Sequence, residues 1–465
     1  MTAFSYFSRC FIRRTVVFPK SVGGCLSQHL LQHSGLIALT SPGIFSLSPV
    51  FIRVLDKLVN LVKTKMVALG AQQMLLPTIG DSNLWTTSGR WNNIEQLFRV
   101  KDRNDKFYCL QPTYEEEVTS LLTTWEISYK DLPILLYQIS NKYRDELRPK
   151  HGLLRCHLYS FDADLSAALK TYKNVCDSYA DLLSTLGLPY YKVCADAGHI
   201  GGQLSHEFHI PLPIGEDLLY ICTKCGTGVN AECKGLSYYL SGRIFADHSD
   251  LLHPTDTECS HNFAEVRGVE VGHCFLLGQR YSKCFNATFD SPKGKKLFEM
   301  GCFGLGLTRL LAASIEHFSA ASFPDLSADE ITELRWPPGI SPFAGAVALQ
   351  KKSAKDALSP SDLKLIMDAF NAPDQNASRC RLVPGDILID DRKGLSLGRK
   401  LIDLKRLGIP WIVIAKTNHN RAQQYELVDV YRKRSSEANL EQIQSAFWNP
   451  TEFDSSALPE WRYER

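Results

Sequence analysis

The spacing of apolar residues predicts a long amphipathic helix between Val50 and Leu69. The residues that recur at intervals of three and four are Phe51, Leu55, Leu58, Val62 and Met66. This spacing places them on one face of a helix, and Gly70 supplies a stop signal at its end. The segment QQMLLPTI that follows is typical of a strand punctuated by Pro77.

The middle of the chain alternates short strands with helices. Residues 94–110 predict a hairpin around RNDK, and PTYEEEVTSLL predicts the start of a helix. Two strands joined by a basic turn are expected in YRDELRPKHGLLRCHLYSFD, and further strands in YYKVCAD and GVEVGHCFLL. In EMGCFGLGLTRLLAAS a glycine-rich strand end leads into another helix.

The pattern changes after residue 342. The segment 319–342, which holds FPDLSADE and WPPGISP, is predicted to be a linker. Beyond it, AGAVAL, DILIDD, PWIVIA and YELVDVY predict strands that alternate with helices, one of them in GLSLGRKLIDLKRLG. The alternation predicts a small α/β domain. A chain of 465 residues is in any case too long for one ordinary core.

The start of the chain is basic and free of acidic residues. The first acidic residue is Asp56, and the basic residues before it are Arg9, Arg13, Arg14, Lys20 and Arg53. This composition is typical of a mitochondrial transit peptide, which we place at residues 1–34, whereas FIRRTVVFPK breaks the apolar run of a secretory signal. No later apolar run reaches the roughly 18 residues of a membrane span. We therefore expect a protein of the mitochondrial matrix with no membrane partner.

Arg144 and Glu146 lie two residues apart, so in a strand they share a face. Taken alone, they could form an exposed ion pair worth under about 1 kcal/mol. The turn that follows adds the basic residues Arg148, Lys150, His151 and Arg155. An arginine on a strand that faces such a turn can hold a polyphosphate.

The segment PTYEEE allows two interpretations. Thr113 as an N-cap, with Glu116 three residues later, would form a capping box. Glu115 is then free, and a carboxylate beside a hydroxyl suits a cationic amine.

The glycines before Arg309 have the order G-x-x-G-x-G, the reverse of the dinucleotide-binding fingerprint, and no long βαβ unit surrounds them. They could let the backbone lie flat under a nucleotide while Arg309 reaches its terminal phosphate. Alternatively, they could only permit close helix packing.

The 14 cysteines are scattered, which favours buried thiols over a disulfide framework. We expect no metal site, although a zinc site stays open as an alternative. Its ligands would be Cys222, Cys225, Cys259 and His261. The single residue between the last two is unusual for zinc ligands, and SHEFH lacks the H-E-x-x-H spacing.

Several of these segments occur in the order found in class II aminoacyl-tRNA synthetases. They are LQPTYEEEVTSL, KYRDELRPKHGLLR, GGQLSHEF, GVEVGHCFLLGQRYS, EMGCFGLGLTRLLAA, WPPGISPF and IDDRKGLSLGRKLIDLKRLGIPWIVI. From about Leu36 onward they resemble the prolyl-tRNA synthetases of the bacterial-like mitochondrial type. The resemblance implies an α+β catalytic domain over 35–318, built on an antiparallel sheet with flanking helices. A linker over 319–342 and an α/β anticodon-binding domain over 343–465 would follow.

The resemblance also implies an activity. ATP with Mg²⁺ would activate L-proline, and the prolyl group would pass to tRNA(Pro) on a homodimeric enzyme. Arg144 would be the catalytic residue, because it would hold both the α-phosphate and the substrate carboxylate. The ATP-binding residues would be Arg144, Glu146, Arg155 and Arg309. The residues at the amino-acid pocket would be Thr113, Glu115, Glu270 and His273.

Lys plus Arg total 52 against 50 acidic residues, so a contact with tRNA must depend on local patches. One patch lies in and around GLSLGRKLIDLKRLG and comprises Arg392, Lys393, Arg399, Lys400, Lys405 and Arg406. We predict phosphate contacts through Arg392, Arg399 and Lys400. A solvated helix face would have the same composition.

The chain departs from the family in one strand. Family members follow GLLR with a small residue and a strand resembling REFxMKDxYxF, whereas here GLLRC leads almost directly to HLYSFD. About half a dozen residues of a central strand are missing, an even number that preserves the alternation of the rest. The loss includes a phenylalanine expected to stack on adenine, worth about 1 to 3 kcal/mol. We therefore expect little or no proline-dependent exchange between ATP and pyrophosphate.

Two alternative functions stay open. A non-catalytic synthetase-like accessory or nucleic-acid-binding protein could share the fold, but a retired site has no reason to keep Arg144, Glu146 and Arg309. Another class II specificity, such as threonine or histidine, is disfavoured by RPKHGLLR and GVEVGHCF.

Overall fold

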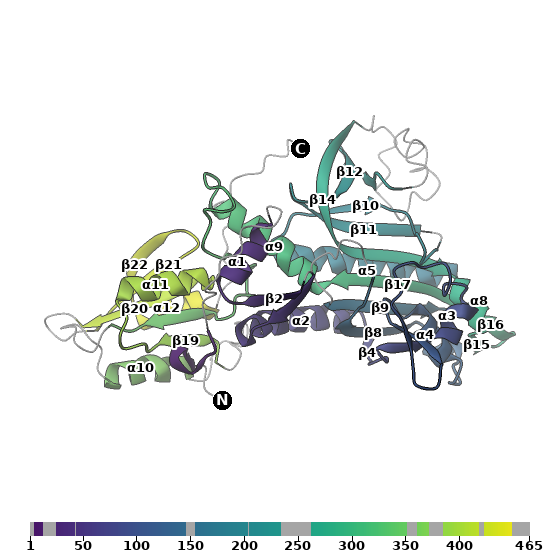
Figure 1. Ribbon diagram of the computed structural model, residues 1–465, viewed down its shortest axis with the longest axis horizontal. Helices are drawn as coiled ribbons and strands as arrows, with labels where there is room; N and C mark the ends of the chain where they lie inside the picture. Colours follow the sequence, from purple (N-terminus) through teal and green to yellow (C-terminus); the bar gives the residue numbers. More distant parts are fainter. Residues whose placement is uncertain are drawn as a thin grey trace. The chain divides into compact units, whose positions relative to one another are not determined.

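The computed structural model describes residues 4–12, 25–41, 43–145, 154–202, 204–233, 262–350, 360–371, 385–417 and 423–448. They form two compact units. One consists of Val59–Ala313, and the other joins the residues up to Leu58 with those from Ser314 onward. The first unit holds a large sheet and the second a smaller one (Figure 1).

The large sheet has nine strands. In spatial order they are β11 (Leu204–Pro211), β10 (Tyr191–Cys194), β13 (Gly228–Asn230), β12 (Asp217–Cys222), β14 (Phe263–Gly278), β17 (Glu299–Gly306), β9 (Leu154–Asp162), β8 (Ile134–Asn141) and β4 (Gln72–Gln73). β11 also pairs with β14. The strands from β14 to β8 are antiparallel to their neighbours, so the antiparallel sheet expected for a class II catalytic domain is confirmed.

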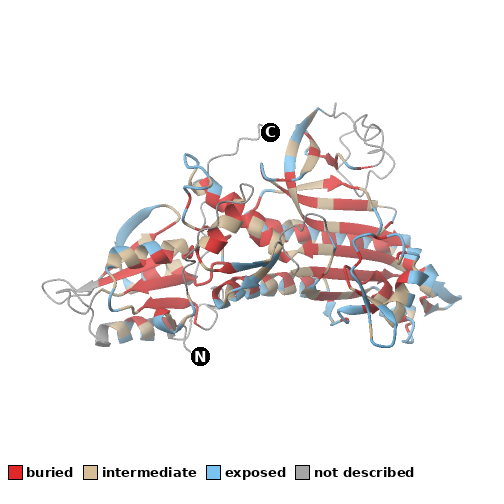
Figure 2. Cartoon of the chain, in the orientation of Figure 1, coloured by how far each residue is buried: buried red, intermediate tan, exposed pale blue. Residues whose placement is uncertain are grey.

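Helices cover both faces of this sheet. On one face, α5 (Leu165–Thr185) packs along β9, β14 and β17 (Figure 1). It begins where the N-cap Asp164 accepts a hydrogen bond from the Ala167 amide at 2.9 Å. The other face carries α4 (Glu115–Leu122), which packs against α8 (Arg280–Phe285). Figure 2 shows that the central strands between these layers are largely buried.

Smaller elements surround the sheet. They are α3 (Ser82–Thr87), a three-stranded sheet of β5 (Ile79–Asp81), β7 (Phe107–Leu110) and β6 (Arg99–Lys101), and a hairpin of β15 (Thr288–Ser291) with β16 (Gly294–Leu297). A hairpin of β2 (Ile37–Ser41) with β3 (Ile44–Leu47) belongs to the second unit. The predicted helix from Val50 to Leu69 is α2 (Pro49–Ala68). The hairpin predicted at 94–110 is formed by β6 and β7.

The smaller sheet has six strands. In order they are β1 (Phe4–Tyr6), β19 (Ile387–Asp390), β18 (Gly345–Ala348), β20 (Trp411–Thr417), β21 (Gln423–Asp429) and β22 (Arg434–Ala438). Pairs from β1 to β20 are parallel, and the last two pairs are antiparallel. The helices of this part are α10 (Pro360–Asn371), α11 (Leu397–Arg406) and α12 (Leu440–Trp448). The α/β domain expected after residue 342 is therefore present.

Two ordered segments fall within the predicted transit peptide. In β1, Phe4 is 7% exposed and its ring lies edge-on at 6.0 Å from Phe370. In α1 (Leu26–His33), the Ser27 amide donates to Glu316 Oε1 at 2.6 Å, on α9 (Leu307–Ser322). Both segments thus pack on the second unit, and their removal on import stays a prediction.

The segment predicted as a linker begins inside α9, which runs to Ser322. Ser319 is buried, and its hydroxyl accepts a hydrogen bond from the Arg335 amide at 3.1 Å. Trp336 is also buried and donates through Nε1 to the Leu407 carbonyl at 2.8 Å. The predicted linker start at residue 319 is therefore wrong, because packing, which composition does not reveal, orders this segment.

Candidate active site

A cavity of about 260 Å³ lies on the α4 side of the large sheet. Its walls come from β9, β11, β14 and β17, from the start of α9 and from loop residues 90–96, 112–113 and 196–200. Six of the residues predicted from the sequence line it: Thr113, Arg144, Arg155, Glu270, His273 and Arg309. Glu146 lies outside the described residues.

A row of side chains crosses the sheet under this cavity. His157 on β9 is paired with Gly304 on β17, which is paired with His273 on β14. His273 is paired in turn with Glu207 on β11. Because neighbours in a cross-strand row point to the same face, two imidazoles flank the open surface above Gly304.

A buried ion group forms one end of the site. Arg90 Nη1 donates to Glu115 Oε2 at 3.1 Å and to Glu116 Oε1 at 3.0 Å, and all three side chains are almost fully buried. Burial acts to lower the pKa of Arg90, but the two carboxylates and Tyr281 outweigh it and raise the pKa above its ordinary value. The guanidinium therefore stays charged and shares its charge between two carboxylates.

Glu115 is held by two further donors. The Thr113 hydroxyl lies 2.6 and 2.7 Å from its two oxygens, and the Cys302 thiol donates to Oε1 at 3.0 Å. Burial raises the pKa of the Cys302 thiol well above its ordinary value, and the nearby Glu115 adds to the effect. The thiol is therefore a donor to Glu115 and not a thiolate.

The predicted capping box does not form. The N-cap of α4 is Tyr114, with no side-chain hydrogen bond to the helix. Thr113 gives its proton to Glu115, and Glu116 pairs with Arg90 instead of reaching back to the N-cap. The buried carboxylates take these donors because they would otherwise remain uncompensated.

Guanidinium groups form the other end of the site. Arg144, Arg155 and Arg309 all line the cavity. Arg144 follows the end of β8 and is not in a strand, which corrects the expectation that it projects from one. The neighbouring backbone is fixed, because the Asp145 amide donates to the Gln96 carbonyl at 2.9 Å.

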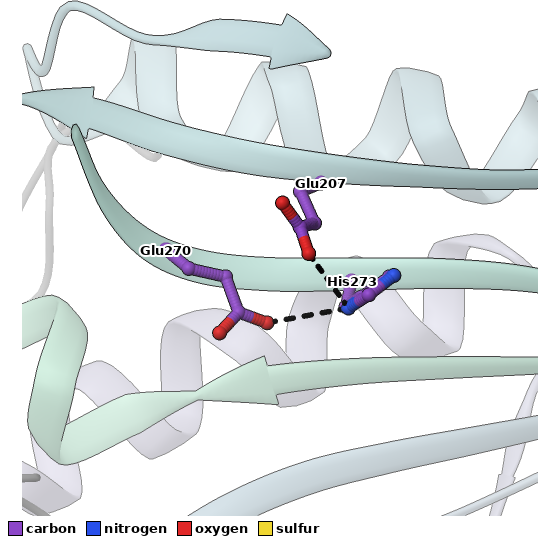
Figure 3. A group of neighbouring side chains, drawn as sticks. All are labelled: Glu207, Glu270 and His273. Atoms are coloured by element: carbon purple, nitrogen blue, oxygen red, sulfur yellow. Dashed lines mark ion pairs between the residues drawn. The ribbon is translucent and has the colours of Figure 1, made fainter. Parts of the chain in front are cut away.

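Glu270 and His273 belong to a charged cluster on β14 (Figure 3). His273 Nδ1 lies 3.4 Å from Glu270 Oε1 and 3.4 Å from Glu207 Oε1, and its Nε2 is 2.7 Å from the Ser205 hydroxyl. Arg309 Nη1 donates to Glu270 Oε2 at 2.9 Å. Burial alone would raise the pKa of Glu270, but His273 and Arg309 hold it well below its ordinary value.

The strand expected to be cut short is a complete member of the sheet. β9 has nine residues and pairs along its length with β8 and β17. Leu154 stands opposite Asn141, the last residue of β8, so β8 and β9 are paired up to the end of β8. The predicted alternation is preserved, since Arg155 and His157 both line the cavity.

Two of the four ligands of the alternative zinc site fall within the residues that the structure describes. Cys259 and His261 lie outside the described residues. Cys222 is buried, and the Cys225 thiol donates to the Thr227 hydroxyl at 3.2 Å.

The basic residues of α11 do not share one environment. Lys400 is 1% exposed, and its ammonium donates to the carbonyls of Leu349 and Asp390 at 2.8 and 2.9 Å. The prediction that Lys400 contacts tRNA is therefore wrong, because a buried ammonium cannot meet a phosphate. Arg392 pairs with Asp390 and Asp403.

Arg399 is the most accessible of the three predicted tRNA contacts. Its side chain is 37% exposed and lies 3.9 Å from Asp403. The pairs made by Arg392 leave its side chain only 20% exposed. Of the three residues, Arg399 therefore exposes the largest fraction of its side chain.

Three residues of the site escaped the sequence interpretation: Arg90, His157 and Glu207. Arg90 lies in SGRWNN, a polar stretch with no spacing relation to Glu115. The sequence suggested Glu207 only as part of SHEFH, and it suggested His157 only as one of three rings of HLYSFD that could replace the missing ring at adenine. Each reaches the site through strand pairing or a long-range contact, which local patterns do not show.

Comparisons with known proteins cover most of the chain. The sequence profile of the tRNA synthetase class II core domain (G, H, P, S and T) matches residues 98–318, a range that spans Thr113 to Arg309. A probable mitochondrial proline–tRNA ligase of Rattus norvegicus is 39% identical over 401 residues, which are 84% of this chain and 78% of that protein. The chain belongs to the proline–tRNA ligase family.

Other members of the family give the same result. A probable mitochondrial proline–tRNA ligase of Schizosaccharomyces pombe is 35% identical over 88% of this chain and 90% of its own length. The proline–tRNA ligase of Ehrlichia ruminantium is 35% identical over 90% of this chain and 92% of its own. The chain thus matches these two relatives, one mitochondrial and one bacterial, over about nine tenths of their length.

Solved structures of family members share the fold. The prolyl-tRNA synthetase of Cryptosporidium parvum, in complex with L-proline and AMP, has a TM-score of 0.66 at 15% identity and covers 92% of this chain and 75% of that one. The enzyme of Giardia lamblia, in complex with prolyl-adenylate, has a TM-score of 0.67 at 16% identity over 90% and 75%. Among the described residues of this family member, none of the helices is long and apolar enough to cross a membrane.

Proposed function

We propose that this protein is a proline–tRNA ligase, which activates L-proline with ATP and transfers the prolyl group to tRNA(Pro). The observation that carries the proposal is the separation of charge along one cavity. At one end Thr113 lines the cavity, and its hydroxyl is hydrogen-bonded to the fully buried carboxylate of Glu115. At the other end the lining residues are Arg144, Arg155 and Arg309. The ammonium group of an amino acid requires a carboxylate environment, and a polyphosphate requires guanidinium groups.

The amino-acid end would recognise the secondary ammonium of proline. Glu115 and Glu116 share a single arginine, Arg90, so the group carries an excess negative charge when both are ionised. A buried ammonium supplies the missing positive charge and can donate to Glu115. Thr113 fixes the orientation of that carboxylate.

The phosphate end would allow two anions to meet. In adenylation the proline carboxylate attacks the α-phosphorus in line and pyrophosphate leaves, so no covalent nucleophile of the protein is needed. Arg144 would hold the carboxylate and the α-phosphate together, while Arg155 and Arg309 hold the remaining phosphates. Positioning and charge neutralisation of this kind supply most of the catalysis in such reactions.

The Mg²⁺ that accompanies ATP would be held by carboxylates at this end. Glu207 and Glu270 offer oxygen atoms that, with His273, lie within 4.8 Å of one another. One or two carboxylates together with substrate phosphates are a usual Mg²⁺ site, so the residues fit the ion. It would add positive charge beside the phosphates, and His273 would orient the two carboxylates from between them.

The remaining parts of the proposal concern partners and location. We assign tRNA contact to the second unit, through Arg399 on α11, and propose that the protein acts as a homodimer. We place it in the mitochondrial matrix, with residues 1–34 as the transit peptide. The basic start of the chain and the mitochondrial descriptions of its relatives support this location.

Aminoacylation of purified mitochondrial tRNA(Pro) tests the proposal. We expect the full chain to charge this tRNA with labelled proline, but not with alanine or threonine, and Arg144→Ala to lose the activity. Lys293→Ala, an exposed change on the turn between β15 and β16, is the matched control. A chain that binds tRNA and ATP but forms no prolyl-tRNA would support the accessory-protein alternative.

A further inference from the structure

His157 occupies a particular place in the cavity. Its neighbours two and four residues along β9, Tyr159 and Phe161, share its face of the strand but are buried in the core. Phe161 packs edge-on against Phe298 at 5.6 Å. Of these three rings, only His157 lines the cavity, so it is the ring of β9 that a ligand can touch.

The opposite strand leaves space for a ligand beside His157. A β-carbon added to Gly304 would lie 3.6 Å from His157 Nε2, in ordinary van der Waals contact. Because position 304 has no side chain, the volume above it is open between His157 and His273. This opening lies between the carboxylate end of the cavity, at Cys302, and the guanidinium end, at Arg155 and Gly306, two residues away on either side.

Hydrogen bonds fix the proton on His157. The Tyr114 amide donates to the Tyr159 hydroxyl oxygen at 2.9 Å. Thr113 gives its own proton to Glu115 and is 3.5 Å from the Tyr159 hydroxyl. The shorter acceptor for the Tyr159 proton is therefore His157 Nδ1 at 3.1 Å. An imidazole that accepts at Nδ1 carries its proton on Nε2.

The surroundings keep both partners in the required protonation state. Burial lowers the pKa of His157 well below its ordinary value, and the positive charges of Lys142, Arg155 and Arg144 add to this effect. Burial raises the pKa of Tyr159 well above its ordinary value, with a contribution from Glu115. The imidazole is thus neutral and the phenol retains its proton. The same cations favour an anion in the cavity.

We propose that His157 donates its Nε2–H to a non-bridging, anionic oxygen of the α-phosphate of prolyl-adenylate. This oxygen would lie above Gly304, next to the bond that joins the phosphate to the prolyl group. Tyr159 is the positioning residue that fixes the tautomer. This inference rests on the proposed function, since it names a contact within the same site. It assigns a role to the residue that stands where the chain is shortened.

The test uses the full chain and a prolyl-adenylate analogue in which sulfamoyl replaces the phosphate. We expect His157→Leu to weaken calorimetric binding of this analogue by about 10- to 100-fold, the usual loss for a hydrogen bond to a charged group. The exchange kcat should fall by a similar factor. His157→Gln, whose amide can place a donor near the Nε2 position, should recover most of the affinity, whereas His157→Asn should not.

A second measurement does not depend on activity. Nitrogen chemical shifts of the His157 ring should show an unprotonated Nδ1 and a protonated Nε2, and Tyr159→Phe should remove this preference. The Nε2 resonance should move when the analogue binds. Thermal unfolding of each variant identifies changes that only disrupt the fold.

The outcomes distinguish a failure of the proposed role of His157 from a failure of the ligase proposal. Wild-type affinity in a folded His157→Leu protein, or a proton on Nδ1, would overturn the role of His157 while leaving the ligase proposal intact. An unmodified chain with no proline-dependent exchange would contradict the ligase proposal. In that case the analogue titration still decides whether His157 holds an anionic ligand, and failure to bind the analogue would overturn the inference too.

Discussion

At the scale of single residues, the site depends on one buried cation. Arg90 is 4% exposed and bridges Glu115 and Glu116, and its guanidinium carbon lies 4.9 Å from the centre of the Trp85 ring. Removing one partner of a buried ion pair leaves an uncompensated charge, which usually costs about 3 to 5 kcal/mol. The residue therefore has a structural role in addition to setting the charge of the amino-acid end.

We expect Arg90→Met to lower the free energy of unfolding of the first unit by about 3 to 5 kcal/mol, measured by urea denaturation at pH 7. Arg99→Met is the matched control, because Arg99 lies at the surface, where its guanidinium donates to main-chain carbonyls. The double change Arg90→Met with Glu116→Gln should recover part of the loss. A single variant within 1 kcal/mol of the unmodified protein would show that the carboxylates are neutralised in another way.

Asp162 gives a prediction about pH. It ends β9, is 1% exposed, and accepts a hydrogen bond from the Thr171 hydroxyl at 2.7 Å. Burial raises the pKa of this carboxyl to about 6, and Asp164 and Glu299 add to the effect. An unfolded aspartate titrates near 3.9, so the folded state binds the proton more tightly. Stability should therefore fall as pH rises from about 4 to 6 and stay low above that range.

We expect Asp162→Asn to raise the free energy of unfolding by about 2 to 3 kcal/mol at pH 8, because the amide removes the buried charge and keeps the acceptor for Thr171. The gain should vanish near pH 3.5, where the aspartate is protonated in both states. Urea denaturation at the two pH values measures the difference. A variant that is less stable at pH 8 would mean that the ionised carboxylate has a favourable partner.

At the scale of elements, the sequence patterns predicted those parts that depend on local chemistry. The apolar spacing located α2 to within one residue at each end. The helix expected in GLSLGRKLIDLKRLG is α11, and Gly408, whose φ is 71°, follows its end. The order of segments identified the large antiparallel sheet through a family resemblance. By contrast, the role of Arg90 depends on a contact across 25 positions with Glu115, which no local pattern contains.

The strand β9 shows more clearly what could not be predicted from the sequence. The sequence showed that residues are missing relative to the family. It did not show how the remaining residues of β9 would pair with β8 and β17. In the structure, Leu154–Asp162 pair without a break with both β8 and β17. Because β9 is buried between two strands, a shift of one residue would move its whole hydrophobic face, which favours this register. In it, His157, Gly304 and His273 form one cross-strand row.

The helix α11 gives a prediction that separates two adjacent basic residues. Arg399→Ala should weaken tRNA binding and reduce the dependence of its affinity on salt. It should have little effect on stability, because the side chain is only half-buried and lies 3.9 Å from Asp403. Lys400→Ala should instead lower the free energy of unfolding of the second unit by at least about 2 kcal/mol, since two carbonyls and Asp390 lose a buried donor. Filter binding across a salt series and thermal unfolding measure the two effects. Equal tRNA affinity for Arg399→Ala and the unmodified chain at low salt would remove α11 from the proposed interface.

At the scale of the whole molecule, the N-terminal segment has two competing interpretations. Its composition predicts removal on import, yet β1 pairs with β19 and Ser5 donates to the Gly385 carbonyl at 2.8 Å. We expect the mature protein purified from mitochondria to begin near Gly35, which N-terminal sequencing can establish. A mature chain that retains Phe4 would contradict the transit peptide and make β1 a permanent strand of the second unit.

The central claim is that this chain still activates proline although residues of a central strand are missing. That loss of about half a dozen residues was the reason to expect little or no activity. The structure shows a continuous β9 and a cavity lined by Arg144, Arg155 and Arg309. The missing aromatic ring should still weaken ATP binding, because base stacking is worth about 1 to 3 kcal/mol.

The most direct test is exchange of labelled pyrophosphate into ATP by the unmodified full-length chain, with and without L-proline. The account predicts exchange that requires proline, shows a raised KM for ATP and disappears in Arg144→Ala. No proline-dependent exchange at saturating ATP, in a preparation that is folded and binds ATP, would contradict it.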